Sequence, residues 1–146
     1  MDDGIARSAL RDSAPDRFVA LRRELGVTTF GINQILLEPG QRSRIHRHHR
    51  QEEVYLVLNG TLTVCVEGEP HELSVGELMR VAPSVRRQLV NRGPGTVSVL
   101  ALGGANEHAG RDGEAFSSWE QTTGAAPQDI PLPEDLPAAE RRGAPD

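Results

Sequence analysis

The chain has no lysine, one cysteine and only five aromatic side chains among its 146 residues. Without lysine, no side-chain amine is available for Schiff-base chemistry. A single cysteine, Cys65, cannot form an internal disulfide, and its apolar surroundings in TLTVCV predict a small buried side chain. The few aromatics and the net charge of -5 argue against a nucleic-acid surface, which needs a basic stripe and stacking platforms.

Long apolar segments are also missing. No run approaches the roughly 20 apolar residues of a membrane span, and the start, MDDGIARS, lacks the basic-then-apolar order of a signal peptide. We therefore expect a cytoplasmic protein that does not contact membranes. The length is about that of one domain, which is enough for one buried core.

The charges are unevenly distributed along the chain. Residues 17–106 hold eleven arginines and eight acids, a net of +3, whereas residues from 107 onward hold three arginines and nine acids, a net of -6. From residue 122 the composition turns to Pro, Gly, Ala and acids. This composition is typical of a tail that is disordered or draped over the surface, here over a basic body.

Short runs rich in Val, Ile, Leu and Thr follow one another through the middle of the chain, with turn residues between them. They span residues 29–37, 43–48, 52–58, 61–67, 77–82, 86–91 and 96–103. Strands joined by connections too short for crossover helices predict an all-β antiparallel sandwich or barrel. Asn59-Gly60, between two of the runs, predicts a β-hairpin.

The segments on either side of these runs differ from them. Residues 16–25 carry apolar side chains at helical spacing and end at Gly26, which suits a C-cap. Phe116 and Trp119 favour packing over exposure. We expect an N-terminal arm and short helix over 1–25, a barrel over 26–104, a packing segment over 105–121 and an irregular tail over 122–146.

The stretch HRHHRQEE places three of the five histidines beside two glutamates. The period of two in a strand puts Arg44, His46 and His48 on one face. On the next strand Glu53 and Tyr55 share a face that is otherwise apolar enough to be an interior. A buried carboxylate is costly unless it is paired or coordinated, and imidazole nitrogens and carboxylate oxygens are ligands for divalent first-row metals.

Gly40, His46, His48, Glu53 and Gly60 match, at every fixed position, the first signature motif of the cupins, a family that the sequence resembles over more than half of its length. The resemblance implies a double-stranded β-helix, or jelly-roll barrel. It also implies that His46, His48 and Glu53 are three of the usual four metal ligands.

The second cupin motif is only partly matched. Gly76, Pro83 and Asn91 are recognisable, but Arg87 stands four residues before Asn91, where the family has the fourth ligand histidine. Gln88 is the nearest neutral substitute. Strand alternation turns it to the opposite face from Arg87 unless a bulge intervenes.

Three interpretations of the site remain open. In the first, His46, His48 and Glu53 hold Fe(II), Mn, Zn or Ni with open positions for substrate. Arg87 would then lie near the metal and clamp a substrate carboxylate or enolate. In the second, Arg87 pairs with Glu53 in place of a metal, and Arg44 is a second clamp in a pocket for an anion. In the third, the barrel serves dimerisation and its polar interior has no function.

Other residues near the cluster have weaker assignments. Tyr55 is either a core aromatic or a proton donor. His49 falls outside the motif, and Glu52 points to the opposite face from Glu53, so both are expected to be bystanders. The outward face of the same strand is unusually apolar, which favours a second layer or a homodimer. That face carries Val54, Leu56 and Leu58.

Two functional hypotheses follow. One is a metal-dependent enzyme of oxygenase, isomerase or lyase type that acts on a small anionic or polyhydroxylated metabolite, with Arg87 and Arg44 orienting the substrate and Tyr55 donating a proton. The other is a protein that binds a small molecule or a metal without turnover. No helix-turn-helix segment is predicted, which weakens a direct regulatory role.

Overall fold

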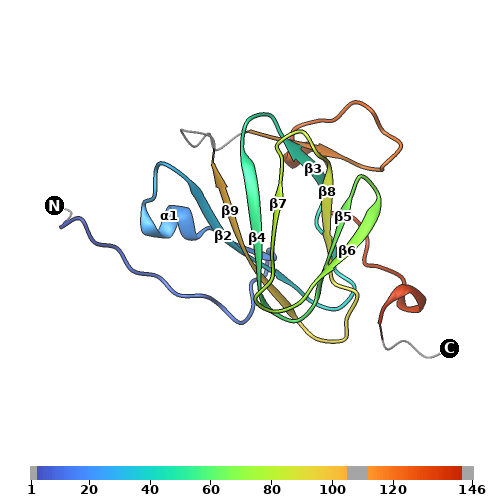
Figure 1. The fold of residues 1–146 in the computed structure, drawn as a ribbon, viewed down its shortest axis with the longest axis horizontal. Helices are drawn as coiled ribbons and strands as arrows, with labels where there is room; N and C mark the ends of the chain where they lie inside the picture. Colours follow the sequence, from blue (N-terminus) through green and yellow to red (C-terminus); the bar gives the residue numbers. More distant parts are fainter. Residues whose placement is uncertain (1–2, 105–111, 143–146) are drawn as a thin grey trace.

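The computed structural model describes residues 3–104 and 112–142, and its strands form two antiparallel sheets that pack face to face (Figure 1). In spatial order, the first sheet consists of β1 (Phe18–Val19), β2 (Gly31–Leu37), β9 (Val97–Gly104), β4 (Glu52–Asn59) and β7 (Leu78–Val81). The second sheet consists of β10 (Gly113–Phe116), β3 (Ile45–His48), β8 (Arg87–Val90), β5 (Leu62–Val66) and β6 (Glu69–Leu73).

This architecture is a double-stranded β-helix, so the predicted fold class is confirmed. From β2 to β5 the chain passes from one sheet to the other at each connection, and from β6 to β9 it does so again. All seven predicted runs are strands, and β1, β6 and β10 are additional. Within the described ranges, no helix is long and apolar enough to cross a membrane.

The predicted hairpin at Asn59-Gly60 is wrong. β4 and β5 belong to different sheets, and β4 pairs instead with β7 and β9. Asn59-Gly60 forms the corner between the sheets. Gly60 has φ of 79°, a Cβ there would lie 2.7 Å from the carbonyl oxygen of Thr96, and Asn59 Nδ2 donates to the same oxygen at 3.1 Å. The corner uses the same conformational freedom of glycine as a tight hairpin turn, which explains why the sequence pattern predicted a hairpin.

The N-terminal helix is shorter than predicted. α1 covers Leu21–Leu25 and ends at Gly26, whose left-handed conformation (φ 73°) closes it as expected. Phe18 and Val19 are extended instead and pair with β2. Arg17, with φ of 63°, turns the chain into this edge strand, and strand pairing there overrides the helical spacing.

The interior between the sheets is filled at one end and open at the other. The filled end holds aliphatic side chains that are at most 1% exposed, namely Leu37, Val57, Leu62, Val64, Leu89, Val97 and Val99. Burial of each contributes roughly 1.5–3 kcal/mol. At the other end the inner positions of β2 and β9 include Gly31, Ala101 and Gly103, and Gly103 pairs with Glu53. These small residues leave room for a cavity beside Glu53.

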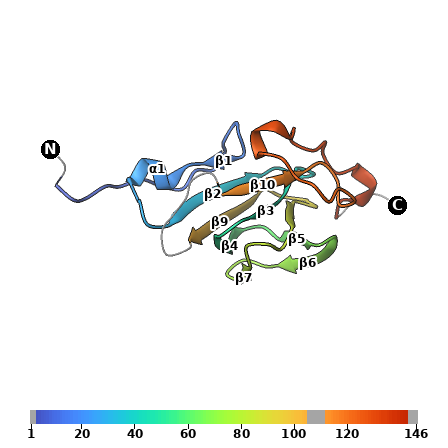
Figure 2. The ribbon, with the colours of Figure 1, turned by 90° about the horizontal axis from the view of Figure 1, so that it is seen from above.

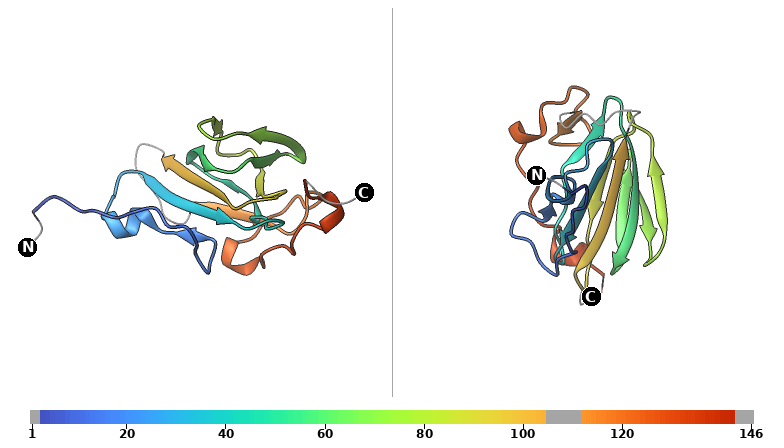
Figure 3. Two further views of the ribbon diagram at one scale, coloured as in Figure 1. Left: turned by 90° about the horizontal axis from the view of Figure 1, so that it is seen from below. Right: turned by 90° about the vertical axis from the view of Figure 1, so that its left-hand side faces the viewer.

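The chain after the barrel packs against it. β10 pairs with β3, and Phe116 is 2% exposed. Residues 122–142 follow with two short 3₁₀ turns, Pro127–Asp129 and Ala138–Glu140, and Leu136 is buried. Residues 105–111 of the expected packing segment and 143–146 of the tail lie outside the described residues. α1 with β1 and the C-terminal segment lie on the same side of the barrel (Figures 2 and 3).

Candidate metal site

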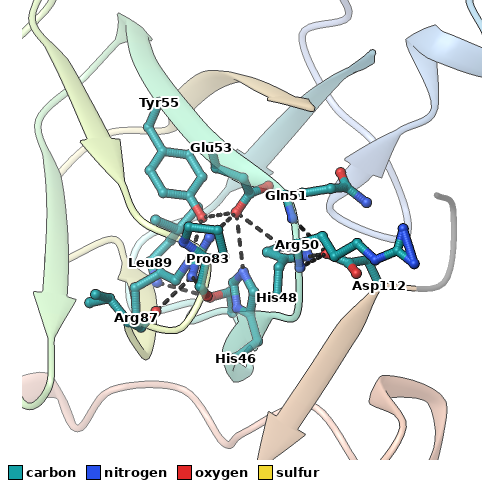
Figure 4. Close-up of polar contacts among 12 residues, drawn as sticks. His46, His48, Arg50, Gln51, Glu53, Tyr55, Pro83, Arg87, Leu89 and Asp112 are labelled. Atoms are coloured by element: carbon teal, nitrogen blue, oxygen red, sulfur yellow. Dashed lines mark hydrogen bonds and ion pairs between the residues drawn. The ribbon is translucent and has the colours of Figure 1, made fainter. Parts of the chain in front are cut away.

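Two histidines and a glutamate meet at the open end of the barrel (Figure 4). His46 and His48 project from β3 of the second sheet, and Glu53 enters from β4 of the first. One possible ligand atom from each lies within 4.8 Å of the other two. The Nε2 atoms of His46 and His48 are 3.7 and 3.2 Å from Oε1 of Glu53. The fold therefore brings together the three residues that the motif spacing singled out.

The outer nitrogens of both imidazoles face oxygen atoms. Nδ1 of His46 lies 2.9 Å from the carbonyl oxygen of Arg44, which can only accept, so this nitrogen carries the hydrogen and Nε2 keeps its lone pair. Nδ1 of His48 is 3.8 Å from Oδ2 of Asp112. Both ring nitrogens of His48 are buried and have no hydrogen-bond partner within the described part of the chain. A metal ion would satisfy such an orphaned nitrogen.

Arg87 lies at the position of the fourth ligand. It pairs with His46 in the register of β8 and β3, and its side chain is fully buried. Every guanidinium nitrogen makes a hydrogen bond: Nε donates to the hydroxyl of Tyr55 at 3.2 Å, Nη2 donates to Oε1 of Glu53 at 2.9 Å, and Nη1 donates to two carbonyls of the preceding loop. Burial of this cation is tolerated because it is both paired and fully hydrogen-bonded.

These bonds change the role expected for Arg87. Its guanidinium is not part of the cavity wall, and its nitrogens already have partners, so this geometry does not offer it to a substrate as a clamp. It holds Glu53 instead. The ion pair expected from the second interpretation is present, while the two histidines still face the carboxylate from the other strand.

Tyr55 completes the support of Glu53. Its hydroxyl donates to Oε1 of Glu53 at 2.6 Å. Burial, together with the negative charge of Glu53, raises the pKa of Tyr55 well above its usual value, although Arg87 opposes this. The phenol therefore stays protonated at neutral pH. It is a hydrogen-bond donor to Glu53, rather than a group that readily releases a proton to a substrate.

Glu53 is ionised despite its position. Burial alone would raise its pKa, but the adjacent imidazoles of His46 and His48 outweigh this and hold the pKa well below its usual range. A carboxylate beside two imidazoles is the donor set of a two-histidine, one-carboxylate metal site. The residues present therefore fit a divalent first-row metal, and His46, His48 and Glu53 would hold it.

A cavity of about 640 Å³ opens beside the triad. Its walls include the small residues of β2 and β9, the edge strand β1, α1 and part of the C-terminal segment. Arg44 lies in the wall as predicted, and its Nε donates to the carbonyl oxygen of Ile130 at 2.5 Å. The size is ordinary for a small-metabolite site.

The two residues expected to be bystanders lie outside this cavity. The side chain of His49 is 60% exposed, and its Nε2 is 3.8 Å from Oε2 of Glu114. Glu52 points outward and pairs with Arg80 at 2.6 Å. The stretch HRHHRQEE therefore contains more histidines and glutamates than the site uses.

Sequence reasoning missed Asp112 and Asn33. Asp112 is 7% exposed, and its Oδ2 accepts hydrogen bonds from the backbone N–H groups of Arg50 and Gln51, at 2.9 and 2.8 Å. It thereby ties down the loop that joins β3 to β4. Asn33 lines the cavity from β2, and its amide has no hydrogen-bond partner among the residues described. Asn33 could have been found from the sequence because strand alternation turns it toward the interior. No local pattern in the sequence indicates Asp112.

Comparisons with known proteins agree with this fold. A cupin protein from Bacteroides fragilis is 22% identical, with a TM-score of 0.62, and the match covers 84% of this chain and 98% of that one. A sugar phosphate isomerase from a cupin superfamily, from Silicibacter pomeroyi, is 23% identical, with a TM-score of 0.61 and coverage of 81% and 82%. At these identities the likeness shows the fold alone.

Sequence comparison gives a consistent result. An uncharacterized protein from Methanocaldococcus jannaschii is 26% identical over 74 residues, which is 48% of this chain and 59% of that protein. This chain thus spans less than two thirds of the length of that curated relative. The sequence profile of the cupin domain matches residues 33–103, the region that holds the triad and Arg87. With the double-stranded β-helix and the complete first motif, this match identifies residues 33–103 as a cupin domain.

Proposed function

We propose that this protein is a metal-dependent enzyme of oxygenase, isomerase or lyase type that acts on a small anionic or polyhydroxylated metabolite. The observation that carries the proposal is the pair of imidazoles on β3. Their Nε2 atoms lie 3.7 and 3.2 Å from Oε1 of Glu53, and both nitrogens of His48 are buried without a hydrogen-bond partner among the described residues. In a cluster that served stability alone, we would expect these buried nitrogens to make hydrogen bonds.

The residues around the cavity divide into two roles. His46, His48 and Glu53 would hold the metal, which would supply Lewis-acid polarisation of a substrate oxygen atom. Tyr55 and Arg87 fix Glu53 through its Oε1. The substrate is oriented by other groups of the wall, chiefly Arg44, which carries the positive charge, and Asn33, which offers an amide.

The second candidate is a metal-free cupin that binds an anion without turnover. It is favoured by the 2.9 Å ion pair between Arg87 and Glu53, which already neutralises the carboxylate. In this case the histidines and Arg44 would contact the anion directly, and the cavity would need no metal.

Metal analysis separates the two candidates. Protein purified without chelators is expected to hold close to one divalent ion per chain, and Glu53→Ala is expected to lose it. His49→Ala is the matched control, because this histidine is exposed and lies outside the cavity. A parent protein with fewer than about 0.2 ions per chain, even after reconstitution with Fe(II), Mn, Zn or Ni, would rule out the metal enzyme.

Catalytic turnover is tested on protein loaded with the divalent metal. Oxygen uptake with candidate acids identifies an oxygenase, and NMR of sugar and hydroxy-acid substrates under nitrogen identifies an isomerase or lyase. Consumption that disappears in Glu53→Ala and persists in His49→Ala supports an enzyme. Tight ligand binding with no consumption by the loaded protein favours the binding function.

A further inference from the structure

The mouth of the cavity is unusually rich in arginine. Arg17 precedes β1, Arg22 and Arg23 lie on α1, and Arg42 and Arg44 precede β3; all five line the same cavity as the triad. Three of them, Arg17, Arg22 and Arg23, lie before residues 33–103, the region that matches the cupin profile. The cationic mouth is therefore built partly by this chain's own N-terminal segment.

The positive charge at the mouth is largely uncompensated. Elsewhere arginines pair with carboxylates, as in Arg11–Glu24, Arg47–Glu114, Arg80–Glu52, Arg86–Glu67 and Arg142–Glu72. Among the described residues, no carboxylate lies within 4.0 Å of the guanidinium groups of Arg22, Arg23, Arg42 or Arg44.

Most partners of these guanidinium groups are neutral. Arg22, Arg42 and Arg44 donate to backbone carbonyls, which orient a guanidinium and leave its charge in place. Arg17 also donates to a carbonyl, and its contact with Asp135 is long, at 3.9 Å, and half-exposed.

Acidic groups in the cavity wall do not cancel this charge. Glu53 is paired with Arg87, whereas Asp112 accepts from two neutral backbone N–H groups and keeps its charge. Asp16 is the remaining carboxylate among the lining residues, and it is exposed at the rim. Five arginines against two acids that are not paired with arginine, Asp16 and Asp112, leave a net positive charge at the mouth, which attracts a group with more than one negative charge.

We infer that this mouth is a subsite for a phosphate group, made chiefly by Arg22, Arg23 and Arg44 and separate from the metal ligands. Arginine forks bind phosphate oxygens bidentately, and several arginines together favour a dianion over a single carboxylate. The inference rests on the proposed function for the reaction itself, which would take place at the metal ligands at the other end of the cavity. There, a phosphorylated metabolite would present its reacting carbon atoms to His46, His48 and Glu53.

Apolar side chains at the mouth suit the carbon skeleton of such a molecule. Phe18 on β1 and Leu132 on the C-terminal segment line the cavity and are 48% and 42% exposed. β1 and the C-terminal segment, to which these two residues belong, lie on the same side of the barrel (Figures 2 and 3). An occupied cavity would cover part of this exposed apolar surface.

The subsite is tested without metal. Inorganic phosphate is titrated into protein treated with chelator, by isothermal titration calorimetry at low ionic strength. Arg23→Ala removes an exposed side chain that makes no hydrogen bond or ion pair with described residues, so the fold is expected to persist. Arg44→Gln removes the charge from the wall. Each change is expected to weaken phosphate binding about tenfold.

Arg80→Ala is the matched control, because Arg80 is equally cationic and exposed but lies on the outward face of β7. Its affinity for phosphate is expected to equal that of the parent. No phosphate binding by the parent, or equal losses in Arg23→Ala and Arg80→Ala, would overturn the subsite. Tighter binding of malonate than of phosphate would overturn the choice of a phosphate group.

The result is independent of the metal site. Phosphate binding to a chain that never holds metal leaves the subsite standing and rejects the metal enzyme. Full metal occupancy without any phosphate binding would support the metal site and overturn the phosphate subsite. On metal-loaded protein, ribose 5-phosphate is expected to bind at least about tenfold more tightly than ribose; equal affinities would count against the subsite.

Discussion

Arg87 is a fully buried cation whose partners are all internal. Its ion pair with Glu53 neutralises both charges at the wall of the cavity, and Tyr55 bridges the two groups through its hydroxyl. A histidine at this position would be a ligand, whereas an arginine can only donate hydrogen bonds. The substitution thus turns a ligand position into a support for the carboxylate ligand opposite.

Removing this support is expected to be costly. Arg87→Met leaves the carboxylate of Glu53 without its cation and should lower the free energy of unfolding by about 3–5 kcal/mol, measured by urea denaturation of metal-free protein. Arg80→Ala, which breaks an exposed ion pair, should cost less than about 1 kcal/mol. Equal, small losses in the two variants would show that the buried pair contributes no more than a surface pair.

Tyr55 offers a direct spectroscopic probe, since it is the single tyrosine of the chain. Burial and the charge of Glu53 raise its pKa, so the folded protein favours the neutral phenol. The stabilisation is complete below the usual tyrosine pKa and is lost as the pH rises from there toward the folded-state pKa. Absorbance at alkaline pH should show ionisation well above the usual range, accompanied by loss of stability; a normal midpoint in folded protein would contradict this.

At the level of elements, the loop between β3 and β4 sets the distance between the histidines and Glu53. Asp112, which precedes β10, holds this loop by accepting two backbone hydrogen bonds, and its Oδ2 also lies 3.8 Å from Nδ1 of His48. The last strand of the second sheet therefore helps to position ligands that lie far earlier in the chain.

Asp112→Ala should therefore affect both the loop and the metal site. Loss of the buried acceptor is expected to cost about 1–3 kcal/mol of stability. Metal affinity, measured by competition with a chromophoric chelator, should fall about 10- to 100-fold. Glu114→Gln on β10 is the control, because its carboxylate pairs with Arg47 and makes only a long contact of 3.8 Å with the exposed His49 of the loop. Unchanged affinity in Asp112→Ala would mean that the loop holds its shape without this contact.

At the scale of the whole molecule, the outward face of the first sheet remains apolar. Val54, Leu56 and Leu58 on β4 are half-buried, and Leu78 on the neighbouring β7 is 61% exposed. The N-terminal segment covers only part of this sheet, where Arg11 and Gln34 exchange hydrogen bonds through the backbone of Arg11.

The homodimer predicted from the sequence stays a prediction that this face supports. Light scattering after size exclusion should give twice the mass of one chain, and Leu56→Asp should give a monomer because it places a charge in the apolar face. Val75→Asp, at an exposed apolar residue outside the first sheet, should leave the dimer intact. A monomeric parent would contradict the prediction.

Local patterns in the sequence were sufficient to predict seven of the ten strands of the described residues and the triad. Alternation of apolar side chains indicates these seven strands, and a fixed motif brings His46, His48 and Glu53 within eight positions. Other features needed the tertiary structure. Arg87 and Glu53 form a hydrogen bond although they are 34 residues apart in the sequence, and Asp112 and Gln51 form one at a separation of 61 residues. No periodicity in the sequence links either pair. The Asn59-Gly60 corner and the arginine-lined mouth were likewise decided by which sheets and chain ends pack together, a long-range outcome that local spacing does not encode.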